Sequence, residues 1–164
     1  MRKQKGFSLI ELLIVVAIIL IIAAIAIPNL LRSRIAANEA SAVGSIRTLN
    51  TAEVTYSSTY PDQSFTCTIG NLGPPAGTGS ATSTTAGLID SVLASGTKSG
   101  YSFALTGCTA AGSTSINVTY QSTGVPVAAG QTGQRAFCSD QSGVIKYDAG
   151  GAAATCISGT SALQ

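Results

Sequence analysis

The sequence predicts an α+β protein in which one long N-terminal helix is joined to a small head built on an antiparallel sheet. The first observation behind this prediction is a break in composition. One dense aliphatic run lies before residue 28, whereas the rest of the chain is rich in Gly, Ser, Thr and Ala. The second observation is a change in periodicity, from helical spacing before residue 60 to alternating apolar residues in short runs after residue 100.

Charge and composition argue against two classes of function, nucleic-acid binding and Ser-His-Asp catalysis. The net charge is +2, and Arg2, Lys3 and Lys5 supply three of the positive charges, so a chain without these three carries −1. No cluster of cations remains to bind phosphate, and we therefore expect no nucleic-acid partner. The sequence has no His, which rules out a Ser-His-Asp triad. We expect a protein that is not an enzyme and needs no cofactor.

A membrane-length apolar run follows the basic start of the chain. Residues 9–27 are apolar except for Glu11, and as a helix they span about 28 Å, close to the thickness of a bilayer core. The basic residues before the run predict a cytoplasmic N-terminus, although Arg32 and Arg34 on the other side weaken this asymmetry. A carboxylate in a membrane segment is costly, so Glu11 is expected to have a function.

Three other interpretations of this run stay open from the residues alone. An ordinary signal peptide would be cut after Ala26, but the run is long for that class and contains Glu11. A plain membrane anchor gains nothing from a carboxylate. A buried helix of a soluble domain needs a larger and more apolar domain around it than this chain offers.

The residues around the start of the run resemble a known processing motif. Residues 5–13, Lys-Gly-Phe-Ser-Leu-Ile-Glu-Leu-Leu, are similar to the motif of type IV prepilins and of the pseudopilins of type II secretion. The resemblance implies that residues 1–6 are a leader cut after Gly6 and that the new N-terminal residue, Phe7, is N-methylated. It also places Glu11 at the family's glutamate position, fifth in the mature chain, and makes Pro28 a bend in the helix.

The same resemblance implies a function. It points to the pilin fold and to a structural subunit, the major pilin, of a type IV pilus, and it leaves open whether the pilus serves adhesion, motility, DNA uptake or conduction. The alternative is a major pseudopilin of type II secretion, and a more remote one is a membrane-anchored binding protein or enzyme. The implied partners are other copies of the chain, a prepilin peptidase and methyltransferase, and an inner-membrane assembly platform. The precursor would lie in the inner membrane with its head in the periplasm, and the assembled pilus on the cell surface.

Elementary electrostatics gives Glu11 a role in such a fibre. A lone carboxylate in an apolar bundle is costly, but a pair between the Phe7 amine of one subunit and Glu11 of the next neutralises both charges. Apolar packing then supplies most of the assembly free energy, and the pair sets the register.

We expect four segments in the chain: leader 1–6, transmembrane and polymerisation helix 7–28, amphipathic helix 29–60 and head 61–164. The apolar residues of the amphipathic helix share one face: Leu31, Ile35, Ala42, Ile46, Leu49, Tyr56 and Tyr60. Pro61 ends this helix, because proline cannot continue it. In the head we expect a short helix at 86–95 with Leu88, Val92 and Leu93 inward. Strands are predicted around residues 101–105, 116–120, 135–138 and 144–147, the last two joined by a turn.

Four cysteines lie in the segment expected to be outside the cytoplasm: Cys67, Cys108, Cys138 and Cys156. An even number in an oxidising compartment indicates disulfides. Their wide spacing does not fit the close ligand pairs of zinc sites, so we expect no metal. Three pairings are open, and we favour the two between sequence neighbours, Cys67 with Cys108 and Cys138 with Cys156. The resemblance also implies a disulfide-bounded loop near the C-terminus.

Overall fold

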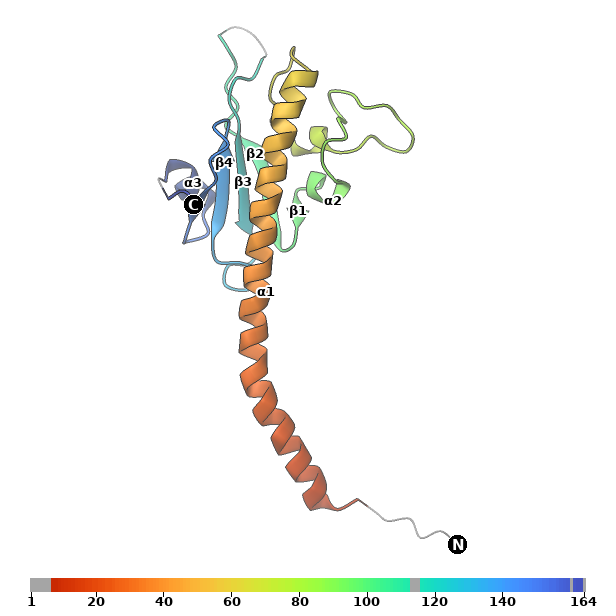
Figure 1. The fold of residues 1–164 in the computed structure, drawn as a ribbon, viewed down its shortest axis with the longest axis vertical. Coiled ribbons are helices and arrows are strands. Elements are labelled where there is room, and N and C mark those ends of the chain that lie inside the picture. The colour runs from red at the N-terminus through yellow and green to blue at the C-terminus, as the bar shows by residue number, and fades with distance from the viewer. Residues whose placement is uncertain (1–6, 113–115, 160, 164) are drawn as a thin grey trace. The chain divides into compact units, whose positions relative to one another are not determined.

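The structure is a computed structural model that describes residues 7–112, 116–159 and 161–163 (Figure 1). The chain divides into two compact units, Met1–Arg34 and Ile35–Gln164. Helix α1 (Leu9–Thr59) contributes to both units.

The second unit contains a five-stranded antiparallel sheet. Its elements after α1 are η1 (Ile69–Leu72), α2 (Ser91–Ala94), β1 (Thr97–Lys98), β2 (Tyr101–Thr106), β3 (Gln121–Pro126), β4 (Ala136–Asp140), β5 (Lys146–Asp148) and α3 (Ala153–Ser158). The order of strands in the sheet is the order in the chain, and each neighbouring pair is antiparallel. The predicted α+β class, with a long N-terminal helix and a small antiparallel sheet, is confirmed.

The core of this unit lies between α1 and one face of the sheet (Figure 1). On α1 the buried apolar residues follow the predicted stripe from Ala42 to Tyr56, with Ile46 and Leu49 fully buried, whereas Leu31 at the start of the predicted stripe is 52% exposed. On β2 every second residue points inward, as the alternating sequence predicts. The fully buried Phe137 of β4 completes the apolar layer.

Gly124 on β3 allows α1 and β2 to pack closely. A Cβ atom at this position would lie 2.9 Å from Cε1 of Phe103 and 3.6 Å from Cδ1 of Ile46. A larger residue would therefore push a core ring aside. The glycine explains why a strand with few large apolar residues sits in the middle of the sheet.

The strand predicted at 116–120 is wrong, because the ladder with β2 begins only at Gln121. Asn117 pairs instead with the segment that follows α1. Its backbone N–H donates to the Gln63 carbonyl at 3.2 Å, and its carbonyl accepts from the Phe65 N–H at 3.3 Å. Its side-chain Nδ2 also donates to the Phe65 carbonyl at 2.9 Å. The alternating Ile, Val and Tyr residues here therefore lie in a loop that is hydrogen-bonded to another loop and not in the sheet.

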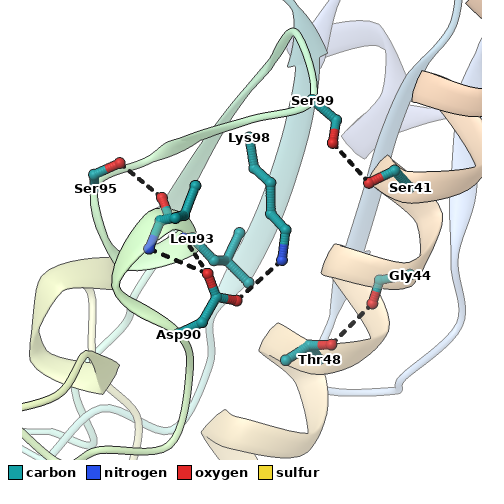
Figure 2. A network of polar contacts seen from close by, with 9 residues as sticks. Ser41, Gly44, Thr48, Asp90, Leu93, Ser95, Lys98 and Ser99 are labelled. Atoms are coloured by element: carbon teal, nitrogen blue, oxygen red, sulfur yellow. Dashed lines mark hydrogen bonds and ion pairs between the residues drawn. The ribbon is translucent and has the colours of Figure 1, made fainter. Parts of the chain in front are cut away.

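The helix predicted at 86–95 is shorter than expected and covers only Ser91–Ala94. The backbone N–H groups of Leu88 and Ile89 donate to the Leu72 carbonyl, which holds the preceding residues extended. Asp90 then caps the helix, since its Oδ1 accepts from the backbone N–H of Val92 and Leu93 (Figure 2). Leu93 is buried as predicted, whereas Val92 is 54% exposed.

A two-residue hairpin joins β1 to β2. Its residues, Ser99 and Gly100, both have positive φ values, 51° and 73°, as a type I′ turn requires. The Ser99 hydroxyl accepts a hydrogen bond from the Ser41 hydroxyl of α1 at 3.0 Å (Figure 2). Lys98 forms an ion pair with Asp90 at 3.0 Å. The hairpin is thus fastened to both α1 and α2.

Two disulfides bridge the head, and they join the pairs that sequence proximity favours. Cys67 is bonded to Cys108, and Cys138 to Cys156, with Cα atoms 6.0 Å apart in each pair. Cys138 lies on β4 and Cys156 on α3, so the second bridge attaches the C-terminal helix to the sheet.

Gly44→Ala is expected to raise the free energy of unfolding of the full chain by about 0.5 to 1 kcal/mol. Gly44 lies inside α1, where glycine is a poor helix former, and a Cβ there would meet no atom within 4 Å. Chemical denaturation of the chain in detergent measures the change. Ala40→Gly, at another exposed position of the same helix, should lower stability by a similar amount. A less stable Gly44→Ala variant would contradict this reasoning.

Candidate functional site

The candidate site is the N-terminal part of α1, and it begins with a cap made by Glu11. The Glu11 Oε2 accepts a hydrogen bond from the backbone N–H of Ser8 at 2.9 Å. Ser8 directly precedes the helix, and its carbonyl accepts from the Leu12 N–H at 3.2 Å. A glutamate at the third helical position that reaches back in this way forms one half of a capping box. We did not predict this role, although the Ser-x-x-Glu spacing indicates it.

The apolar side chains of this segment are exposed on every side of the helix. The large ones between Leu9 and Ile27 are 45 to 73% exposed, and Phe7 before them is 78% exposed. The helix is long and apolar enough to cross a membrane, and none of its most apolar stretch is buried. Apolar surface of this extent marks a site of contact with lipid or protein.

The remaining predicted residues of this segment are placed as follows. Gly6 and the rest of the predicted leader lie outside the described residues. Pro28 lies inside α1, with helix on both sides of it. In the next turn the Ser33 hydroxyl donates to the Asn29 carbonyl at 3.0 Å. The bend expected at Pro28 stays a prediction.

In the second unit, Glu39 of α1 holds the start of β4. Its Oε1 accepts from the backbone N–H groups of Gln134 and Arg135, at 2.9 and 3.1 Å. Its Oε2 accepts from Arg135 Nε at 2.9 Å and forms an ion pair with Nη2 at 2.7 Å. Burial opposes ionisation of Glu39, but these hydrogen bonds and the Arg135 charge outweigh it and hold the pKa below its ordinary 4.5.

Glu39→Ala is expected to lower the free energy of unfolding by about 2 to 3 kcal/mol, because two backbone donors and one guanidinium lose their acceptor. The estimate is reduced because the Arg135 side chain is 42% exposed. Since the folded pKa is lowered, Glu39 stabilises the fold above pH 4.5 and loses this effect as the pH falls through the folded pKa.

Denaturation of the full chain at neutral pH and in acid tests both statements. Asp62→Ala, which removes an exposed carboxylate, is the matched control and should change stability little. Equal stability of Glu39→Ala and the unchanged chain at neutral pH would refute the role of Glu39.

No group of three or more His, Cys, Asp or Glu residues that could hold a metal ion occurs among the described residues. A groove of about 300 Å³ lies along α1, lined by Arg47, Thr48, Thr51, Ala52, Thr55 and Leu88. The hydroxyls of Thr48, Thr51 and Thr55 donate to helix carbonyls four residues earlier, so they are already occupied within α1.

Comparison with known proteins finds a family match in the N-terminal segment. The family model of the prokaryotic N-terminal methylation motif matches residues 1–27. The chain is 67% identical over 39 residues to the type IV wide pilus major component PilA4 of Thermus thermophilus, and 45% identical over 54 residues to the type IV major pilin protein PilA of Myxococcus xanthus. It is also 42% identical over 64 residues to the type II secretion system core protein G of Vibrio cholerae.

These similarities cover only part of each protein. They span 24, 33 and 37% of this chain, and 30, 24 and 44% of the respective relatives. No solved structure matches the chain significantly. Residues 1–27 therefore carry a prepilin-type methylation motif, and the relatives of the chain are type IV pilins and a type II secretion pseudopilin.

Proposed function

We propose that this chain is a structural subunit, the major pilin, of a type IV pilus. The observation that carries the proposal is the apolar surface of α1 between Leu9 and Ile27, which is exposed throughout and interrupted by one carboxylate, Glu11. Such a surface requires a cover of lipid or of other apolar chains. The methylation motif and the two pilin relatives support burial of this surface first in the membrane and then among other subunits in the fibre.

In this proposal the chain passes through two states. A prepilin peptidase and methyltransferase removes residues 1–6 after Gly6 and methylates Phe7, while residues 9–27 hold the precursor in the inner membrane. The N-terminus faces the cytoplasm and the head faces the periplasm. An assembly platform in the membrane then adds the subunit to a helical homopolymer on the cell surface. There the Phe7 amine of one copy pairs with Glu11 of the next, and Pro28 bends the helix between fibre core and head.

A major pseudopilin of type II secretion is the second candidate. The observation that favours it is the match to core protein G, which extends over 64 residues and 44% of that protein. Both candidates use the same N-terminal chemistry. Neither assigns a catalytic role or a cofactor to the chain.

Deletion of the chain tests the two candidates against each other. Electron microscopy of material sheared from the cell surface should show long fibres that disappear on deletion and return when the chain is restored. Loss of protein secretion with fibres intact would instead support the pseudopilin. A mutant with both fibres and secretion unchanged would refute both candidates.

Mass spectrometry of the mature N-terminus tests the processing step independently. The proposal expects a chain that begins with methylated Phe7. A chain that begins with Ile27 would show an ordinary signal peptide cut after Ala26 and would remove the polymerisation helix from the mature protein.

A further inference from the structure

Glu53 is a carboxyl group enclosed in the interior of the second unit. It lies on the core-facing side of α1 between Leu49 and Tyr56, and its exposed fraction is 0%. Its Oε2 accepts one hydrogen bond, from the backbone N–H of Thr66 at 3.0 Å. Its Oε1 has no hydrogen-bond partner among the described residues. Burying such a group costs far less free energy when it is neutral than when it is ionised.

The neighbours of Glu53 do not offset a negative charge. The titratable groups that interact with it are two tyrosines, Tyr56 on α1 and Tyr120 just before β3. Burial, and after it the charge of Glu53, raises the pKa of both phenols, and Asp140 adds negative charge near Tyr120. No cation among the described residues contributes. Burial, opposed only by the Thr66 bond, raises the pKa of Glu53 to about 7.

The bond from Thr66 ties α1 to the start of a disulfide-bounded segment. Thr66 directly precedes Cys67, which is bonded to Cys108. The Thr66 hydroxyl accepts from the backbone N–H of Thr68 at 3.2 Å and from Asn71 Nδ2 at 3.0 Å, so it organises the segment locally. The contact of Thr66 with α1 is made by its own backbone N–H and the Glu53 carboxyl group.

We propose that Glu53 is a proton-operated latch: with its proton bound it holds the segment around Thr66 against α1, and without it that segment opens. An ionised carboxylate with one donor needs further hydrogen bonds, and water can supply them only if the segment moves away. The latch follows from packing within the second unit and does not depend on fibre formation.

Hydrogen exchange of the Thr66 amide in the full chain, in detergent, tests the latch. After correction for the intrinsic pH dependence of exchange, we expect protection of the Thr66 amide to be lower at pH 8 than at pH 5. It should fall by up to about tenfold per pH unit between the ordinary 4.5 of a glutamate and the raised pKa of about 7, and level off above it. In Glu53→Gln a neutral side chain keeps its acceptor at every pH, so protection should no longer depend on pH. Equal protection of the unchanged chain at both pH values would overturn the proposal.

Glu39→Gln is the matched control, because it neutralises the other buried carboxyl of α1 and leaves Glu53 in place. It should keep the pH dependence at Thr66, and loss of that dependence would count against the latch. If Glu53→Gln does not fold, the carboxyl carbon of Glu53 can be titrated by NMR in the unchanged chain. A midpoint near 7 supports the latch, whereas a midpoint at the ordinary 4.5 overturns it.

Discussion

Glu11→Gln is expected to abolish fibres while leaving leader cleavage intact. Glutamine still offers an oxygen to the backbone N–H of Ser8, so the start of α1 keeps its cap. It carries no charge, and in the proposed fibre the Phe7 amine of the neighbouring subunit would then be buried without a partner. Removing one member of a buried pair costs about 3 to 5 kcal/mol, and this cost recurs at each added subunit. The amount of fibre in sheared surface material measures the effect, and mass spectrometry confirms cleavage.

Glu11→Ala separates the two roles of this side chain. It removes both the charge and the cap, and loss of the cap alone costs about 1 kcal/mol. If pairing between subunits is the main role, the Gln and Ala variants should both lack fibres. Normal fibres from Glu11→Gln together with none from Glu11→Ala would show that Glu11 acts mainly as a cap.

Replacing Cys67 and Cys108 together by Ala is expected to lower the free energy of unfolding of the head by about 4 kcal/mol. The bridge closes a loop with a sequence separation of 41, and longer closed loops restrict the unfolded chain more. For the Cys138 and Cys156 pair, with a separation of 18, the same model gives about 3 kcal/mol. Denaturation of the three oxidised chains in detergent measures both effects.

The location of the two bridges provides a second test. Cys67 is exposed, whereas Cys138 and Cys156 are buried. A mild reductant should therefore open the Cys67–Cys108 bridge first, and alkylation followed by mass spectrometry identifies the thiols. A larger loss of stability from the Cys138 and Cys156 replacement would mean that packing of α3 outweighs loop length.

Much of α1 could be predicted because it obeys one period. Ala42, Ile46, Leu49 and Tyr56 are three, four or seven residues apart and are buried as expected. Glu39 and Glu53 continue the same stripe with steps of three and four, so their burial was also readable from the spacing. We missed them because we selected the stripe by apolar character, and a carboxylate is usually at the surface.

The partners of these carboxylates could not be read from the sequence. Arg135 lies 96 residues from Glu39, and only the completed sheet brings them together. Likewise, β3 has no alternating apolar pattern. Gly124 has no side chain, and the side chains of Phe103 and Ile46 lie where its Cβ would be. Residues 116–120 do alternate, yet Asn117 pairs with Gln63 and Phe65 after α1, and the Val118 N–H donates to the Thr109 carbonyl. In both cases tertiary packing overrides the local pattern.

In the proposed precursor, the meander order of the sheet has a consequence for how the head folds. If α1 is inserted first and the rest follows from N- to C-terminus, each strand after β1 finds the strand that precedes it already in place. Among the described strands only β1 waits for a later strand to form its first pairing, so contacts form between near neighbours in the chain. The last element to arrive, α3, carries Cys156, so the final bridge closes only when the whole head has crossed.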